Sequence, residues 1–246
     1  DQVLKLVATD GSALQQASEA LRADAEVVRA AIAQSGRALR YASEPLRGSK
    51  SIVLAALENE GPSWAPRLLG LASEALRADE EVVRAAVVEQ DGRALGHASA
   101  ELRGSKPIVL AALEGSGSEA YYVLRDASES LRADEEVVRV AVAQNGGALE
   151  HASEELRGSK AIVLAALEGK IKGLYGSPLK HASEALRADE EVVRAAVAQS
   201  PDALMYASEE LQQAPGKPMQ IFVKMVGQES KTITLEVTPL ASIESV

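Results

Sequence analysis

Three histidines are the side chains of this chain best suited to acid–base or metal chemistry, and all three occupy one position of a repeated phrase. His97, His151 and His181 each stand directly before an Ala-Ser pair. Other copies of the phrase place different residues there, namely Tyr41, Leu71, Asp126 and Tyr206. A position that accepts such variety is typical of a partly exposed helix site. We therefore expect neither a metal site nor a cofactor.

The other candidates for catalysis are repeated serines and paired glutamates. Eight serines share the same repeat position: Ser18, Ser43, Ser73, Ser99, Ser128, Ser153, Ser183 and Ser208. A nucleophilic serine needs an oriented base, and no shared base accompanies them, so a structural role is expected. Glu80 and Glu81, like their copies, fit the first turn of a helix, where the helix dipole favours negative charge. Gly48-Ser49-Lys50 lacks the upstream glycine and strand of a phosphate-binding loop. The sequence predicts a non-enzymatic protein.

These residues belong to a tandem repeat that sets the architecture. The phrase ASEALRADEEVVRAAV begins at Ala72, and its copies begin at Ala17, Ala127 and Ala182, so the period is 72 − 17 = 55 residues. A related phrase, containing Arg-Gly-Ser-Lys, begins between them at Ala42, Ala98 and Ala152, with a partial copy at Ala207. We call the two half-repeats the acidic form and the lysine form. About eight half-repeats, over residues 1–214, predict a mainly α protein, an α-solenoid of short helical hairpins.

Two short helices are expected in each half-repeat. In the first, residues 94–102, Leu95, Ala98 and Leu102 form one apolar stripe. The second, residues 80–89, presents one apolar face, made of Val82, Val83, Ala86 and Val87.

Residue types at the ends of the second helix predict its caps. The expected N-caps are Asp24, Asp79, Asp134 and Asp189 in the acidic form, and Ser49, Ser105 and Ser159 in the lysine form. The helix is expected to end at a glycine in the left-handed conformation, at Gly36, Gly92 and Gly146.

Composition narrows the class of protein. The chain has 246 residues, a net charge of −10, 3% aromatic residues and no cysteine. Its basic residues are scattered, which argues against nucleic acid as a partner. No apolar run is long enough to span a bilayer, so we expect a soluble, acidic, cytoplasmic protein. A targeting segment already removed from the chain remains an alternative.

Three insertions of unlike sequence interrupt the array, at 59–66, 115–122 and 169–178. Four of the seven aromatic residues lie in them: Trp64, Tyr121, Tyr122 and Tyr175. Variable segments on a repeated scaffold are typical of a binding face. Two interpretations stay open. The aromatic side chains contact a protein partner, or each fills the gap that its own loop opens.

A second region begins after a linker at residues 215–218. From Met219 the pattern changes to alternation typical of strands, with MQIFVK and KTITLEV predicting a β-hairpin. These two segments resemble the first hairpin of ubiquitin, so residues 219–246 are expected to be a partial ubiquitin-like (β-grasp) domain covering the first third or so of that fold. The resemblance implies that Phe222 is a surface contact. Gly216-Lys217-Pro218 stands where ubiquitin precursors carry a cleavable diglycine, which implies a non-cleavable fusion.

Residues 1–214 resemble a family of helical repeats of unknown function with the signature ALxYASEELRxDxEVVLAAVxQNG. The matching segments are Tyr41-Ala42-Ser43-Glu44, Asp189 to Val193, and Gln144-Asn145-Gly146. The family brings no known activity. The short units also resemble leucine-rich variant repeats, which implies that the first helix of each pair is partly a 3₁₀ helix.

The function predicted from these observations is a scaffold or adaptor that binds other proteins through the insertions and the concave helix face. Two alternatives remain: an architectural subunit of a large multi-protein assembly, and a ubiquitin-pathway modifier or ubiquitin fusion protein. The candidate partner-binding residues are Trp64, Tyr121, Tyr122, Tyr175 and Phe222.

Overall fold

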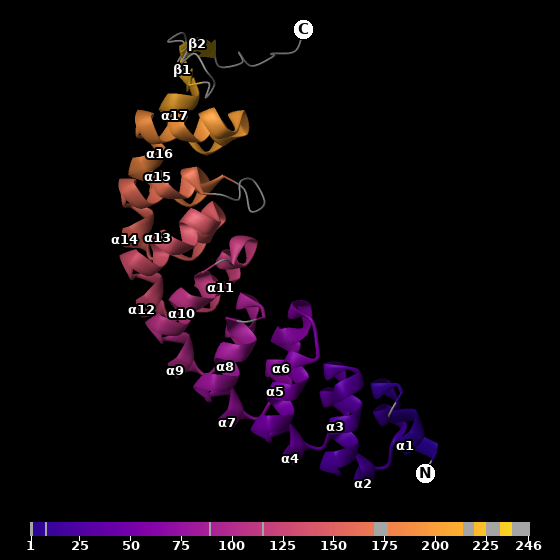
Figure 1. Cartoon of the computed structure of the whole chain (residues 1–246). Helices are drawn as coiled ribbons and strands as arrows, with labels where there is room; N and C mark the ends of the chain where they lie inside the picture. The colour runs from indigo at the N-terminus through magenta and orange to yellow at the C-terminus, as the bar shows by residue number, and fades with distance from the viewer. Residues whose placement is uncertain are drawn as a thin grey trace.

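The computed structural model describes residues 2–7, 9–88, 90–114, 116–169 and 177–213, together with the backbone of 219–224 and 232–237. The linker at 215–218 lies outside the described residues. Figure 1 shows the helices stacked side by side into a curved array, with the N-terminal α1 (Gln2–Val7) at one end. The predicted mainly helical repeat architecture is confirmed.

Most half-repeats contain three short helices in a fixed order. A 3₁₀ helix comes first: η1 (Gly11–Gln16), η2 (Gly36–Tyr41), η4 (Gly92–His97), η6 (Gly146–His151), η7 (Pro178–His181) and η8 (Pro201–Tyr206). A short α-helix of about one turn follows: α2 (Glu19–Arg22), α4 (Glu44–Arg47), α7 (Glu74–Arg77), α9 (Ala100–Arg103), α12 (Glu129–Arg132), α14 (Glu154–Arg157), α16 (Glu184–Arg187) and α18 (Glu209–Gln213). A longer α-helix completes the unit: α3 (Ala25–Gln34), α5 (Lys50–Glu58), α8 (Glu80–Val87), α10 (Lys106–Leu113), α13 (Glu135–Gln144), α15 (Lys160–Glu168) and α17 (Glu190–Gln199).

The expected single helix over 94–102 is therefore wrong: the chain breaks between η4 and α9. Ala98 is extended, with φ −68° and ψ 159°. The break is favoured because Ser99 caps a new helix, its Oγ accepting the N–H of Leu102 at 3.3 Å. The 3₁₀ character implied by the leucine-rich variant repeats is found in the first part of the segment.

A row of backbone hydrogen bonds joins one half-repeat to the next. The serine that caps each one-turn helix donates its own N–H to the carbonyl of the arginine that ends the preceding one, as Ser99 does to Arg77 at 2.8 Å. The other pairs are Ser43 with Arg22, Ser73 with Arg47, Ser128 with Arg103, Ser153 with Arg132, Ser183 with Arg157, and Ser208 with Arg187. Each bond satisfies a carbonyl that a helix C-terminus would leave unpaired. The side chains supply a structural role of the expected kind where they cap the one-turn helix, at Ser18, Ser73, Ser99, Ser128, Ser153 and Ser183. The side chain of Ser43 makes no such bond.

Figure 1 places the one-turn helices α4, α7, α9, α12 and α14 along the outer, convex edge. The row of serine-to-arginine bonds therefore runs along this edge. It links neighbouring half-repeats on the side of the array where the curvature moves them farthest apart.

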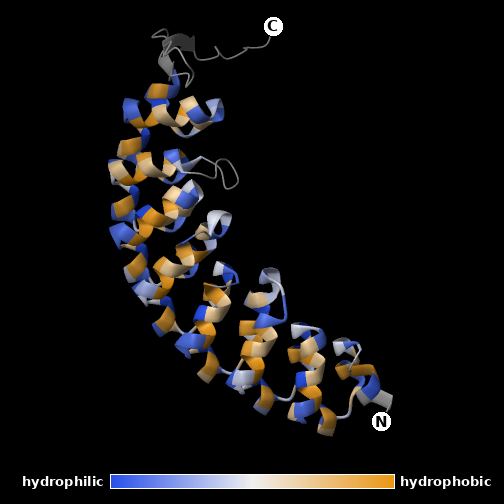
Figure 2. Ribbon diagram, in the orientation of Figure 1, coloured by the Kyte–Doolittle hydropathy of each residue, from blue (hydrophilic) through white to orange (hydrophobic). Residues whose placement is uncertain are grey.

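The core is continuous along the array, because every longer helix buries the same face. In α8 the four buried residues are those predicted, Val82, Val83, Ala86 and Val87, each 2% exposed or less. Figure 2 shows apolar residues in every repeat rather than gathered at one centre. Burying one valine or leucine side chain contributes about 1.5–3 kcal/mol. Helices of this length are marginal alone, so stacking on neighbours supplies their stability.

The expected N-caps are confirmed for one form of the repeat only. Side chains of Asp24, Asp79, Asp134 and Asp189 accept backbone N–H groups two or three residues on. Ser49, Ser105 and Ser159 occupy the same position, but their side chains make no capping bond. Their role was therefore predicted wrongly.

The glycines expected at left-handed helix ends are also explained differently. Gly36, Gly92 and Gly146 begin 3₁₀ helices, and Gly117 has the one positive φ angle, 52°, among the described residues. At Gly36 and Gly146 glycine is needed because the backbone of a neighbouring helix lies too close for a Cβ atom, whereas at Gly92 the close atom is Cγ2 of Val123. A Cβ atom at Gly146 would overlap the carbonyl oxygen of Ala166, and one at Gly36 would overlap that of Ala56.

Ion pairs explain why the two forms alternate. Lys106, the first residue of α10, donates to Asp134 at 2.7 Å and lies 2.9 Å from Glu136, both in the following acidic half-repeat. Lys50 clasps Asp79 and Glu81 in the same way, and Lys160 clasps Asp189 and Glu191. We call each set a lysine clasp. Each joins a lysine-form half-repeat to the acidic form after it.

The clasps predict how stability depends on pH. The hydrogen bond from lysine lowers the pKa of Asp79, Asp134 and Asp189 from the ordinary aspartate value of about 3.9. The pKa of each aspartate is lower in the folded state than in the unfolded state. The clasp therefore stabilises the fold fully above the unfolded-state pKa, and this stabilisation is lost as the pH falls through the folded-state pKa. The hydrogen bonds to the carboxylates also raise the pKa of the three lysines, so their contribution disappears only above about pH 10.4.

We compare the parent with the triple variant Asp79→Asn, Asp134→Asn, Asp189→Asn. When the pH falls from 7 to 3, we expect the melting temperature of the variant to decrease less than that of the parent. Asparagine caps a helix about as well as aspartate, so the variant removes the charge and keeps the cap. Thermal unfolding followed by circular dichroism measures this. An equal loss in both proteins would show that the clasps do not contribute.

Beyond the array the structure has two strands, β1 (Met219–Lys224) and β2 (Thr232–Val237), paired antiparallel from Met219 opposite Val237 to Lys224 opposite Thr232. The side chains of these strands, Phe222 included, lie outside the described residues. Among the helices that the structure describes, none has the length and apolar character needed to cross a membrane.

Candidate protein-binding site

The first two insertions change the helix type of their half-repeats. Each consists of a 3₁₀ turn followed by an α-helix: η3 (Pro62–Trp64) with α6 (Ala65–Leu71), and η5 (Gly117–Glu119) with α11 (Ala120–Asp126). Tyr121 and Tyr122 therefore lie in a helix, not in a loop as expected. Residues 170–176 of the third insertion, and with them Tyr175, lie outside the described residues.

Trp64 is the aromatic residue best placed to bind. It ends η3, directly before α6, and its side chain is half-buried. Two guanidinium groups lie over its ring, that of Arg37 at 4.3 Å from the ring centroid and that of Arg67 at 4.7 Å. Arg67 stands three residues after Trp64, so the helix brings it to the same side, whereas Arg37 comes from η2 of the preceding half-repeat. Tryptophan is the aromatic residue that attracts such cations most strongly.

Glu60 holds Arg37 in position over the indole ring. Its Oε1 accepts from Nε of Arg37 at 2.9 Å, and its Oε2 accepts from Oγ of Ser35 at 3.0 Å. The side chain of Glu60 is only 10% exposed, so solvent screens this pair less than a surface pair. The insertion thus supplies both the tryptophan and the carboxylate that places a cation on it.

The side chains around Trp64 enclose an open cavity of about 430 Å³, which we call the tryptophan pocket. It is lined by Arg37, Arg40, Trp64, Arg67, Leu68, Gly70, Leu71 and His97. Three arginines and an aromatic ring in one concave site favour a ligand group that is anionic and has some apolar surface.

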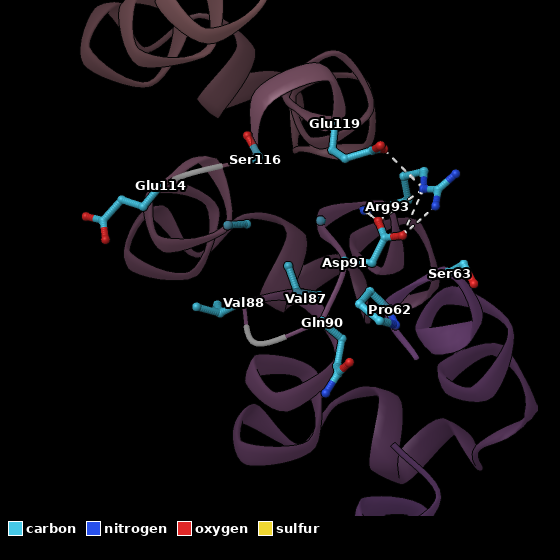
Figure 3. Close-up of a pocket in the computed structure, with 12 residues that line it drawn as sticks. Pro62, Ser63, Val87, Val88, Gln90, Asp91, Arg93, Glu114, Ser116 and Glu119 are labelled. Carbon is cyan, nitrogen blue, oxygen red and sulfur yellow. Dashed lines mark hydrogen bonds and ion pairs between the residues drawn. The ribbon is translucent and has the colours of Figure 1, made fainter. Parts of the chain in front are cut away.

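A second cavity of about 510 Å³, the acidic pocket, lies between the first and second insertions. Figure 3 shows Arg93 between two carboxylates. Arg93 donates to Asp91 at 2.6 Å and lies 3.1 Å from Glu119, and its hydrogen bond to Asp91 raises the pKa of Arg93. Glu114 also lines the cavity. Figure 3 shows the carboxylates of Asp91 and Glu119 directed at Arg93, whereas that of Glu114 points away from it. Three carboxylates and one cation line the cavity, so the site favours a cationic group.

The two adjacent tyrosines pack against the following half-repeat. The ring of Tyr121 meets that of Tyr122 edge to face at 5.3 Å and that of His151 at 4.4 Å. Its hydroxyl donates to Glu150 at 2.9 Å, and burial raises its pKa. Neither tyrosine lines either of the two cavities. This geometry suits a packing role, while a partner-binding role for the pair stays a prediction.

The histidines are divided by their surroundings. His97 is exposed and lines the tryptophan pocket, whereas His151 and His181 are half-buried. Burial lowers the pKa of both half-buried rings, so they stay neutral over a wider pH range. Within the described part of the chain, no three side chains of His, Cys, Asp or Glu gather into a set that could hold a metal ion.

Of the predicted candidates, the structure brings Tyr121 and Tyr122 together and leaves Trp64 in a separate site. Sequence reasoning missed Arg37, Arg40 and Arg67. Only Arg67 stands close to Trp64 in the sequence, so only this arginine left a local signal. The helix stacking that brings 37, 64 and 97 to one cavity could not be read from spacing alone.

Comparison with protein families gives one match. The model of a family described as "Domain of unknown function (DUF4116)" matches residues 1–47, 49–103, 105–157, 134–171 and 160–212. The longer matches each span about two successive half-repeats, in agreement with the 55-residue period. No curated protein and no solved structure matches the chain. The family matches end before Met219 and give no support to the ubiquitin-like assignment, which stays a prediction.

Proposed function

We propose that this chain, which belongs to the DUF4116 family as a tandem array of its repeats, is a non-enzymatic scaffold. It binds other proteins at the face that carries the insertions. The tryptophan pocket is the observation that carries this proposal. A half-buried tryptophan between two arginines has the residue types enriched at the centre of protein interfaces. Figure 1 supports the choice of face, because the starts of α6 and α11 point toward the concave side of the array.

The chemistry around the pocket favours binding over catalysis. Glu60, the carboxylate that contacts Arg37 of the pocket, is held by that arginine, and a general base needs a free position facing a substrate. The proposal rests on residues 9–213 and needs no contribution from residues 219–246. Roles as an assembly subunit or a ubiquitin-pathway protein remain alternatives without an observation that favours them.

Trp64→Ala is expected to weaken partner binding about 10- to 100-fold, which is the loss of a central interface residue. The full chain is first used to capture partners from an extract of its source cells. Each captured protein is then purified and its affinity measured by calorimetry with the parent and the variant.

Tyr206→Ala is the matched control, since Tyr206 is a half-buried aromatic in η8 that lines neither cavity. We expect it to leave the affinity unchanged. If Trp64→Ala instead lowered the melting temperature and left every affinity unchanged, the tryptophan would be a packing residue and the proposal would fail.

A further inference from the structure

The tryptophan pocket and the acidic pocket share one wall. Pro62 and Ser63 line the acidic pocket, and Trp64, the next residue of η3, lines the tryptophan pocket. The two cavities are therefore neighbours that share the three-residue turn η3 in their linings.

Their charges are opposite. The tryptophan pocket has three arginines, of which Arg37 is paired with Glu60. In the described part of the chain, Arg40 and Arg67 form no salt bridge, and each lies over an aromatic ring instead. Two positive charges are thus left uncompensated in a chain whose net charge is −10.

The acidic pocket has the reverse balance. Asp91, Glu114 and Glu119 carry three negative charges against the single positive charge of Arg93. The side chain of Asp91 is only 5% exposed, so its charge acts where water screens it weakly. The lining therefore carries two net negative charges, although Asp91 and Glu119 both contact Arg93.

Resting on the proposed function of this face, we infer that its occupant is an extended protein segment with one acidic and one basic side chain. The acidic side chain enters the tryptophan pocket and contacts Arg40 and Arg67, while the basic side chain enters the acidic pocket. Charge complementarity at the two cavities selects this pair and rejects a segment of a single sign. Because consecutive residues of η3 line the two cavities, we expect an extended chain, which spans at most about 3.3–3.6 Å per residue, to bridge them in about three to five residues.

A random twelve-residue peptide library displayed on phage tests this with the full chain as bait. We expect the enriched sequences to contain Asp or Glu about three to five residues from Lys or Arg. Synthetic copies of enriched peptides are then titrated by fluorescence anisotropy. Arg67→Glu should weaken them about tenfold and abolish the preference for the acidic residue. Glu114→Lys should abolish the preference for the basic residue and keep that for the acidic one.

Arg29→Glu is the matched control, because Arg29 is an exposed arginine of α3 that lines neither cavity, and it should leave binding unchanged. Enriched peptides of one charge sign, or equal effects of Arg29→Glu and Arg67→Glu, would overturn the inference, as would the absence of any enriched sequence. The proposed function is tested separately: it stands if Trp64→Ala still releases the native partners, whatever the charges of the selected peptides.

Discussion

Leu95→Ala is expected to lower the free energy of unfolding by about 2–5 kcal/mol, the cost of removing a fully buried leucine from a packed core. Leu95 is 0% exposed in η4, in the middle of the array. Because each repeat contacts only its neighbours, the loss should not spread evenly. Hydrogen exchange followed by mass spectrometry should show faster exchange in 80–113 than in 25–58 and 182–213.

Met205→Ala is the control for this substitution. Met205 also lies in a 3₁₀ helix, η8, but is 65% exposed, so its truncation should change stability by less than about 0.5 kcal/mol. Uniformly faster exchange along the whole chain in the Leu95 variant would contradict a stack held by nearest-neighbour contacts and would favour one cooperative unit.

Gly146→Ala is expected to cost about 1–3 kcal/mol, the usual penalty for forcing an extra carbon into a packed site. The new methyl group would overlap the carbonyl oxygen of Ala166 on α15. A side chain could relieve the overlap by changing its rotamer, but a backbone carbonyl in a helix cannot. The helices η6 and α15 must therefore move apart. Chemical denaturation gives the free energy, and the variant should unfold at a lower denaturant concentration.

Gly61→Ala separates this packing effect from the general effect of replacing glycine. Nothing lies within 4 Å of a Cβ atom placed at Gly61, and its φ of −73° suits alanine. This variant should be neutral or stabilised by up to about 1 kcal/mol. Equal losses from the two substitutions would show that close approach is not the reason for glycine at 146.

The sequence was sufficient to predict the parts of the fold that depend on periodic burial. The 55-residue period predicted the array, and the apolar face of residues 80–89 predicted the buried side of α8. The aspartate caps were also predictable, because a carboxylate directly before a helix accepts the free N–H groups of the first turn of that same helix.

The failures share a cause, which is that the deciding contact comes from another repeat. Glycine at 146 depends on the carbonyl of Ala166 in α15. Likewise the pocket around Trp64 depends on Arg37 in the half-repeat before it. A pattern within one repeat cannot reveal contacts between two.

The lysine clasps constrain how such a gene can lengthen or shorten. Removing a single lysine-form half-repeat, for example α9 with α10, would bring Glu80 and Glu81 of one acidic form toward Asp134 and Glu136 of the next, with no lysine between them. Like charges at that junction would repel. Removing or copying a neighbouring pair restores every junction. Inheritance should therefore add and delete these units two at a time, and natural arrays of this type should differ in length by multiples of about 55 codons.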